Sequence, residues 1–252
     1  MRCLPVLLCV AALAAACATS PLGRSQFILV SDEEMAQTGA QSFALIAQKT
    51  PVSQNGSTVR YVSCVANTVT REMTANQAWD VKVFESKEVN AFALPGGKIG
   101  VYTGLLKVAK TQDQLAAVLG HEVSHVVARH SAERYSQSVA GSVGAGVLGA
   151  ATGIDPQLYG AAGQLLLLRF SRTQESEADL LGLDYMARAG FDPRGAVSLW
   201  RNMAALGGDK PAEILSTHPS DETRIQALEA RLPQDILVYE QARVAGRRPL
   251  CT

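Results

Sequence analysis

His121-Glu122-Val123-Ser124-His125 (HEVSH) lies near the middle of the chain and matches the pattern H-E-x-x-H. In that pattern two histidines one helical turn apart bind zinc, and the glutamate is a general base. On an α-helix, positions i and i+4 project from the same face, so His121 and His125 can reach one metal ion together. Glu122 lies about 100° around the helix, beside the metal without being a ligand. The pentapeptide therefore predicts a catalytic zinc site.

The helix that carries this motif is expected to run from Gln112 to about Arg129. Its apolar stripe consists of Leu115, Leu119, Val123 and Val126, with Val127 beside it. At 100° per residue, the two histidines fall roughly opposite that stripe, which argues against ordinary core histidines. His130 has no motif partner, and we expect it to be a solvated residue near the end of the helix.

A catalytic zinc site needs a third protein ligand from a separate element. Residues 170–179 (FSRTQESEAD) supply carboxylates, at the start of a long helix expected from about Gln164 to Ala189. Glu175 and Asp179 are four residues apart and share a face, whereas Glu177 points elsewhere. We expect Glu175 to bind the metal and Asp179 to accept a hydrogen bond from a ligand histidine. Glu177 is expected to face solvent or a structural partner.

The two motifs together resemble the membrane-associated metallopeptidases related to the CAAX prenyl protease and HtpX, and in layout their periplasmic BepA- and LoiP-like members. Residues 90–97 (NAFALPGG) resemble the segment that precedes the family's substrate-binding edge strand. Residues 217–219 (THP), with Arg224 following, resemble its C-terminal His-Pro motif. The four motifs occur in the family's order over about residues 31–232. HtpX and the prenyl protease span the membrane several times, whereas this chain has one apolar leader.

The resemblance implies an α+β, mainly helical fold of the zincin (gluzincin) type, with a small β-sheet whose edge strand lines the active-site cleft. It implies one zinc ion per chain, bound by His121, His125 and Glu175, with Glu122 as the catalytic base. The resemblance leaves two alternative roles for His218. It is either an extra zinc ligand that restrains activity or a group that stabilises the oxyanion of the intermediate. Arg224 could face the site or make an ordinary ion pair.

The same resemblance predicts how substrate binds. The strand around Lys98 to Val101 would pair with an extended polypeptide by strand addition. The residues assigned to substrate binding are Asn90, Lys98, Ile99, Gly100 and Val101.

Other elements follow from local patterns. A capping box at Ser31 opens a helix to about Gln48, and a second helix is expected from about Val59 to Thr74. Asp80 to Glu85 alternates as a strand, and residues 90–102 form two strands joined by a turn at residues 95–97. Residues 138–163 are rich in glycine and alanine, with a break at residues 153–156. Further helices are expected from about Pro193 to Leu206 and from Pro219 to Leu232.

The N-terminus has the features of an export signal. Arg2 precedes an apolar stretch from Leu4 to Ala16, which ends in a small-residue run before Cys17. We expect residues 1–16 to be a lipoprotein-type signal peptide, Cys17 to be lipidated, residues 17–30 to be a linker and residues 31–252 to be a single metallopeptidase domain. Ordinary signal cleavage and an uncleaved anchor are the alternatives, and all three export the chain.

Cys64 and Cys251 are the cysteines left for the mature fold. An even pair in an oxidising compartment predicts a disulfide, with two unpaired thiols as the alternative.

Composition limits the classes of function. The chain has 252 residues, 47% of them hydrophobic and 18% charged, and a formal net charge of zero. It is therefore globular, and it has no basic run that would suggest a nucleic-acid partner.

The function predicted is a zinc-dependent endopeptidase that cleaves unfolded or misassembled proteins in the bacterial periplasm or outer membrane. The expected partners are extended polypeptides, the outer membrane through the lipid anchor and outer-membrane assembly machinery. One alternative is a latent or inactive, chaperone-like zinc lipoprotein. The other is a structural envelope protein in which the motif is accidental.

Overall fold

The computed structural model describes residues 17–73, 77–146, 165, 169–204, 214, 218 and 222–252. Its elements are β1 (Cys17–Thr19), β2 (Ser25–Phe27), α2 (Asp32–Lys49), α3 (Gly56–Thr70), β3 (Asp80–Phe84), β4 (Ala91–Leu94), β5 (Lys98–Tyr102), a 3-10 turn (Leu105–Lys107), α4 (Gln112–Val127), α5 (His130–Gly146), α7 (Arg172–Arg188), α8 (Arg194–Ala204) and α10 (Glu222–Val244). The fold is mainly helical with small sheets, as predicted. No helix in these ranges combines the length and apolar character of a membrane span.

The main sheet has the strand order β3-β5-β4. β5 runs parallel to β3 and antiparallel to β4, with Val83 and Ala91 both opposite Val101. Both sides of β5 are therefore occupied, and the prediction that Lys98–Val101 pairs with substrate is wrong. Within the described part of the chain, no strand pairs with the other side of β4. The open edge of the sheet is therefore β4, the strand that precedes β5. The turn at Gly96 and Gly97, both with positive φ, folds β4 back along β5.

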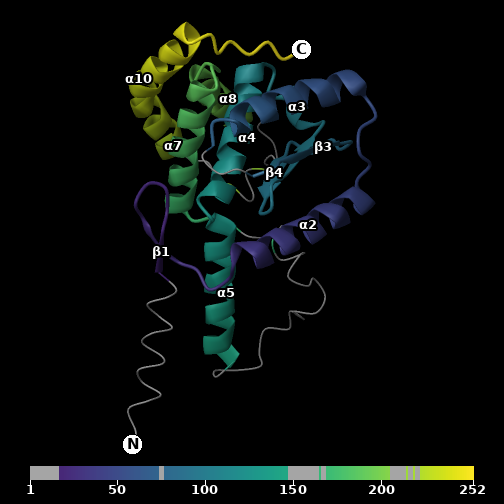
Figure 1. Cartoon of the computed structure of the whole chain (residues 1–252), viewed down its shortest axis with the longest axis vertical. Helices are drawn as coiled ribbons and strands as arrows, with labels where there is room; N and C mark the ends of the chain where they lie inside the picture. The colour runs from purple at the N-terminus through teal and green to yellow at the C-terminus, as the bar shows by residue number, and fades with distance from the viewer. Residues whose placement is uncertain are drawn as a thin grey trace, which may run out of the picture.

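Helix α4 lies at the centre of the molecule, between the sheet and the helices α7, α8 and α10 (Figure 1). α2 and α3 pack on the sheet from opposite sides in this view (Figure 1). α4 and α7 cross where Gly120 meets Gly182, so closely that a Cβ on Gly120 would lie 2.8 Å from the carbonyl oxygen of Gly182. This glycine pair brings together the two helices that carry the HEVSH and FSRTQESEAD motifs.

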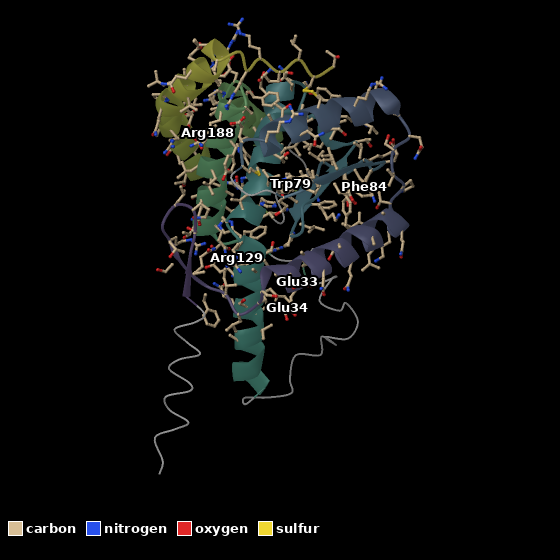
Figure 2. The ribbon with its side chains drawn as sticks, in the orientation of Figure 1. Glu33, Glu34, Trp79, Phe84, Arg129 and Arg188 are labelled. Carbon is tan, nitrogen blue, oxygen red and sulfur yellow. A yellow bond between two sulfur atoms is a disulfide. The ribbon has the colours of Figure 1, made fainter. Side chains whose placement is uncertain are left out.

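An aromatic cluster joins α2 to the sheet. The ring of Phe84, which is fully buried, makes edge contacts with Phe43 and Tyr102 and stacks on Phe92. Phe84 lies at the far end of the sheet from α7 (Figure 2). Such pairs add about 0.5–1.5 kcal/mol each beyond the area they bury, so the cluster fixes α2 against β4.

The predicted linker over residues 17–30 is instead folded into the domain. β1 and β2 form an antiparallel hairpin, with Ala18 opposite Gln26. Gln26 is 3% exposed and donates a hydrogen bond of 2.7 Å to the carbonyl oxygen of Ala128, beyond the end of α4. Ile28 is buried against α2. The linker prediction is wrong. This segment is held by contacts with residues far along the chain, and local composition does not reveal such contacts.

Two helix boundaries also differ from the expectation. The helix predicted from about Gln164 is absent at residues 169–171, and α7 begins at Arg172, where Ser171 and Gln174 form a capping box. α10 continues past Leu232 through Pro233 to Val244. Residues on both sides of the proline are buried, among them Leu228 and Asp235, and their packing offsets the lost backbone bond. The predicted break at residues 153–156 lies outside the described residues.

Cys64 on α3 and Cys251 form a disulfide, which ties the C-terminal tail to α3.

Candidate metal centre

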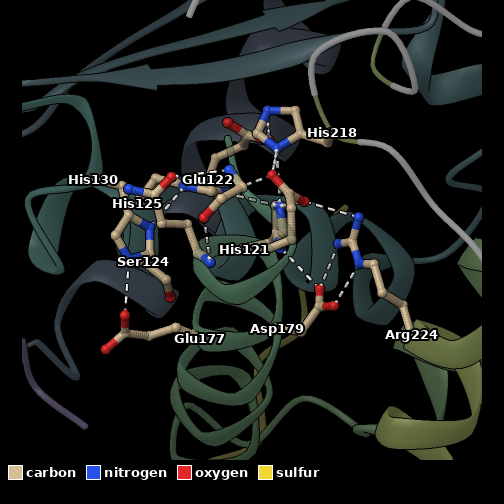
Figure 3. A network of polar contacts seen from close by, with 12 residues as sticks. His121, Glu122, Ser124, His125, His130, Glu177, Asp179, His218 and Arg224 are labelled. Carbon is tan, nitrogen blue, oxygen red and sulfur yellow. Dashed lines mark hydrogen bonds and ion pairs between the residues drawn. The ribbon is translucent and has the colours of Figure 1, made fainter. Parts of the chain in front are cut away.

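Four side chains from three parts of the chain meet beside α4. His121 and His125 come from α4, Glu175 comes from the first turn of α7, and His218 follows later in the chain (Figure 3). One ligand atom of each lies within 4.8 Å of the others, and all four residues are buried. The side chains predicted as ligands are therefore brought together, and His218 joins them.

Four of the distances between these atoms are close to those around a tetrahedral zinc ion. His121 Nε2 lies 3.1 Å from His125 Nε2 and 3.2 Å from His218 Nδ1. Glu175 Oε1 lies 3.0 Å from His218 Nδ1 and 3.6 Å from His125 Nε2. Zinc bonds of about 2.0–2.1 Å in a tetrahedron place neighbouring ligand atoms about 3.3 Å apart. Three imidazoles and one carboxylate are suited to Zn²⁺ in chemistry, and four of their six mutual distances match its geometry, while the whole set extends to 4.8 Å.

His121 is oriented by a carboxylate behind it. Its Nδ1 lies 2.9 Å from Asp179 Oδ1, on the side away from the ligand atoms. Arg224 donates two hydrogen bonds to Asp179, of 2.7 and 2.8 Å, and its Nη1 lies 2.8 Å from Glu175 Oε2. The guanidinium also covers the ring of Trp200 at 4.4 Å. Asp179 thus has the position expected for it, and Arg224 faces the site.

Two carboxylates and His125 have the protonation states that a metal ion needs, whereas His121 holds a proton that the ion would have to displace. Burial lowers the pKa of His121, but Asp179 and Glu175 outweigh it and raise that pKa to about 9. Burial raises the pKa of Asp179 and of Glu175, yet hydrogen bonds from Arg224 to Asp179 and from His121 and His218 to Glu175 hold both pKa values below the usual range. Burial lowers the pKa of His125 well below its ordinary value, and the neighbouring histidines and Arg224 lower it further. Both carboxylates are therefore ionised at neutral pH, and zinc would displace a proton from His121.

Glu122 lies beside the four ligand atoms without belonging to them. The residue is 2% exposed, and its Oε1 has no hydrogen-bond partner within the described residues. His218 Nε2 lies 3.4 Å from this oxygen. A buried carboxylate oxygen without a donor is available to accept a proton.

A cleft of about 210 Å³ opens in front of Glu122. The described residues that line it include β4, Asn90, Phe170 and His218. None of Lys98–Val101 belongs to that lining; Lys98 pairs with Asp80 at 3.4 Å, and Ile99 and Val101 are buried in the core. Of the residues predicted to bind substrate, the structure therefore places Asn90 at the cleft and the four β5 residues away from it.

His130 corrects another expectation. It is fully buried rather than solvated, and its Nδ1 lies 2.9 Å from His125 Nδ1. Arg129, between α4 and α5, has a φ of 55°, and this left-handed residue turns the chain so that His130 returns to the metal ligand. An ion pair of 2.7 Å with Asp32 holds Arg129 beside the first turn of α2 (Figure 2).

Two aromatic rings near the ligands also escaped sequence reasoning. Phe170 stacks on His125 with centroids 3.9 Å apart, and Trp200 makes an edge contact with His121 at 5.9 Å. Phe170 is the first residue of the FSRTQESEAD motif. Its position as a hydrophobic residue just before a helix cap could have predicted that it packs near the site. Trp200 had no sequence signal, since it comes from α8.

Comparison with known proteins places these motifs in a family. The model of peptidase family M48 matches residues 53–232. The chain is 44% identical over 166 residues to mitochondrial metalloendopeptidase OMA1 of Schizosaccharomyces pombe, covering 62% of this chain and 47% of that protein. It is 29% identical over 217 residues to the β-barrel assembly-enhancing protease of Yersinia pestis, covering 81% and 44%. It is 28% identical over 188 residues to metalloprotease LoiP of Escherichia coli, covering 72% and 73%. The chain spans about half the length of the first two proteins.

Proposed function

The chain belongs to peptidase family M48, and from that premise we propose that it is a zinc-dependent endopeptidase acting on unfolded or misassembled proteins in the bacterial cell envelope. The observation that carries the proposal is the buried set of His121, His125, Glu175 and His218, whose ligand atoms lie within 4.8 Å of one another, with Glu122 beside it at the cleft. The test is casein cleavage before and after zinc is removed with a chelator. Cleavage should stop without zinc and return when zinc is restored.

Each residue has a defined part in peptide hydrolysis. Zinc held by His121, His125 and Glu175 would supply Lewis acidity, which polarises a carbonyl and acidifies water. Glu122 takes a proton from the attacking water through its free Oε1 and passes that proton to the leaving amine. Asp179 holds the ring of His121 in the orientation that presents Nε2 to the metal.

The open edge of β4 is proposed to bind substrate as an added strand. The N–H of Tyr102 donates to the carbonyl oxygen of Asn90 at 3.1 Å, so Asn90, Phe92 and Leu94 are the residues that bond to β5. In an antiparallel pair the residues between them, Ala91 and Ala93, direct their backbone groups the other way. Those groups therefore point along the edge that lines the cleft, where they can pair with the main chain of an extended peptide.

Ala93→Pro tests this binding mode. Proline removes one outward N–H and leaves the β4–β5 hydrogen bonds in place. Loss of one hydrogen bond of about 0.5–1.5 kcal/mol should lower kcat/KM for extended peptides by about two- to tenfold. The melting temperature of the zinc-loaded variant is the control. Unchanged kcat/KM in a variant that melts like the parent would show that substrate does not pair here.

The position of His218 supports the restraining role left open by the sequence. Its Nδ1 is one of the four clustered ligand atoms, whereas catalytic zinc sites keep one position for water. We propose that His218 closes the fourth position in the resting state. The same observation favours the second candidate function, a latent zinc protein that binds unfolded chains without cutting them.

His218→Ala separates these roles. If His218 competes with water, removing it should raise casein turnover or self-cleavage at equal zinc content. If it stabilises the oxyanion, turnover should fall by about 10²–10³. Turnover per bound zinc in the variant and the parent decides between them. A variant that holds zinc and remains silent, like its parent, would favour the latent zinc protein.

The compartment is also part of the proposal. The relatives include a mitochondrial protein as well as the two bacterial ones, so sequence similarity alone is compatible with more than one membrane system. The small-residue run before Cys17, typical of a lipoprotein signal peptide, supports an exported lipoprotein at the outer membrane, near the machinery that assembles outer-membrane proteins.

Cys17→Ser tests the lipid anchor. The variant should leave the membrane fraction and remain folded, because the substitution removes the acylated thiol and no core side chain. Membrane fractionation and labelling with a fatty acid check this. Fatty acid that still enters the variant would place the anchor elsewhere.

A further inference from the structure

The two ligand histidines are supported in different ways (Figure 3). His121 contacts the carboxylate of Asp179 directly through Nδ1. Nδ1 of His125 instead faces a second imidazole, that of His130, at 2.9 Å. Nε2 of His130 lies 3.1 Å from Glu177 Oε2. A histidine thus stands between the metal ligand and its carboxylate.

The contacts determine where the protons lie when His125 binds zinc through Nε2. A neutral imidazole that uses Nε2 as a ligand carries its proton on Nδ1. His125 Nδ1–H then donates to His130 Nδ1, which must be unprotonated, so the proton of neutral His130 is on Nε2. His130 Nε2–H in turn donates to the carboxylate of Glu177. Each ring nitrogen of His125 and His130 is then either a metal ligand, a hydrogen-bond donor or a hydrogen-bond acceptor.

The N-terminal hairpin holds the far end of the line. Arg24 Nε donates to Glu177 Oε2 at 2.9 Å, and the hydroxyl of Ser20 donates to Glu177 Oε1. Arg24 also makes two hydrogen bonds of 2.7 Å to Glu133 on α5, which further accepts from Gln174. Ser20 and Arg24 belong to the turn between β1 and β2. The hairpin is therefore the part of the chain that fixes Glu177.

We propose that His130 and Glu177 are positioning residues for the metal ligand His125, and that the N-terminal hairpin completes this support through Arg24. The inference rests on the zinc site proposed above. Both ligand histidines are then held by hydrogen bonds that lead to an arginine. Arg224 holds the carboxylate that contacts His121, and Arg24 holds the carboxylate that contacts His130 behind His125.

The first test is zinc affinity in the full chain, with Glu122→Gln as the parent so that self-cleavage is prevented. His130→Phe keeps a ring but removes both hydrogen bonds. Loss of such a partner costs about 10–100-fold in metal affinity, so the zinc dissociation constant should rise by that factor. Arg24→Gln should shift it in the same direction. The matched control is Arg247→Gln, which breaks an arginine–carboxylate pair with Glu72 elsewhere in the fold and should leave zinc affinity unchanged.

The second test needs no further variant. In the zinc-loaded parent, long-range ¹H–¹⁵N NMR of the imidazoles should show His130 with Nδ1 unprotonated and Nε2 protonated. A His130 that is doubly protonated, or protonated on Nδ1, would overturn the inference. So would unchanged zinc affinity in a folded His130→Phe. A parent that binds no zinc would instead overturn the proposed function, and the inference with it.

Discussion

Glu122→Gln is expected to lower casein cleavage by at least about a hundredfold and to leave zinc content unchanged. Glutamine has nearly the same size and shape as glutamate but does not accept the proton of the attacking water. Glu122 is not one of the four clustered ligand residues, so the substitution leaves the metal set intact. Turnover and bound zinc should be measured on the same preparation.

Two outcomes would contradict this role for Glu122. Near-normal turnover by the variant would mean that another group removes the proton. A proportional loss of zinc would mean that Glu122 acts as a ligand. His218→Ala is the natural companion measurement, because His218 Nε2 lies 3.4 Å from the same carboxylate.

Arg224→Met is expected to lower the free energy of unfolding by about 3–5 kcal/mol, because it leaves buried carboxylates without their cation. Arg224 is 7% exposed and pairs with both Asp179 and Glu175. Methionine retains part of the side-chain volume against Trp200, so the loss reports mainly the charge. Denaturant unfolding of the zinc-free protein, with the disulfide intact, measures it.

Arg201→Met is the matched control for this substitution. Arg201 pairs with Glu229 at the surface, where both side chains are exposed. An exposed pair contributes about 0–1 kcal/mol, so the control should unfold nearly like the parent. Equal losses in the two variants would show that the buried pairs at the metal centre do not stabilise the fold as argued.

The part of the site that could be predicted from the sequence is the part set by helical phase. His121 and His125 are four residues apart on α4, and Glu175 and Asp179 are four apart on α7. That spacing predicted that Glu175 and Asp179 would lie together and that Glu177 would point elsewhere, while the need for a third ligand and the family resemblance assigned Glu175 to the metal. These features are local, so they needed no knowledge of how the helices pack.

The features that were missed depend on contacts between distant segments. His130 reaches His125 because Arg129 adopts a left-handed conformation, whereas the prediction placed His130 in solvent because it has no motif partner and lies near a helix end. The hairpin of residues 17–27 is held by Glu133 and Glu177, more than a hundred residues away. The family resemblance assigned the edge strand to β5, and the sequence could not correct this because the alternation of a single strand does not encode the pairing order of a sheet.

The central claim is that zinc at this centre makes the chain an endopeptidase. The most direct measurement is a titration of the zinc-free protein with zinc, in which casein turnover and bound metal are followed on the same samples, for the parent and for His218→Ala. We predict that turnover rises in proportion to bound zinc, reaches its limit at one ion per chain, and is higher in the variant. Casein cleavage that does not depend on zinc, or zinc-loaded samples of both proteins that cleave nothing, would contradict the account.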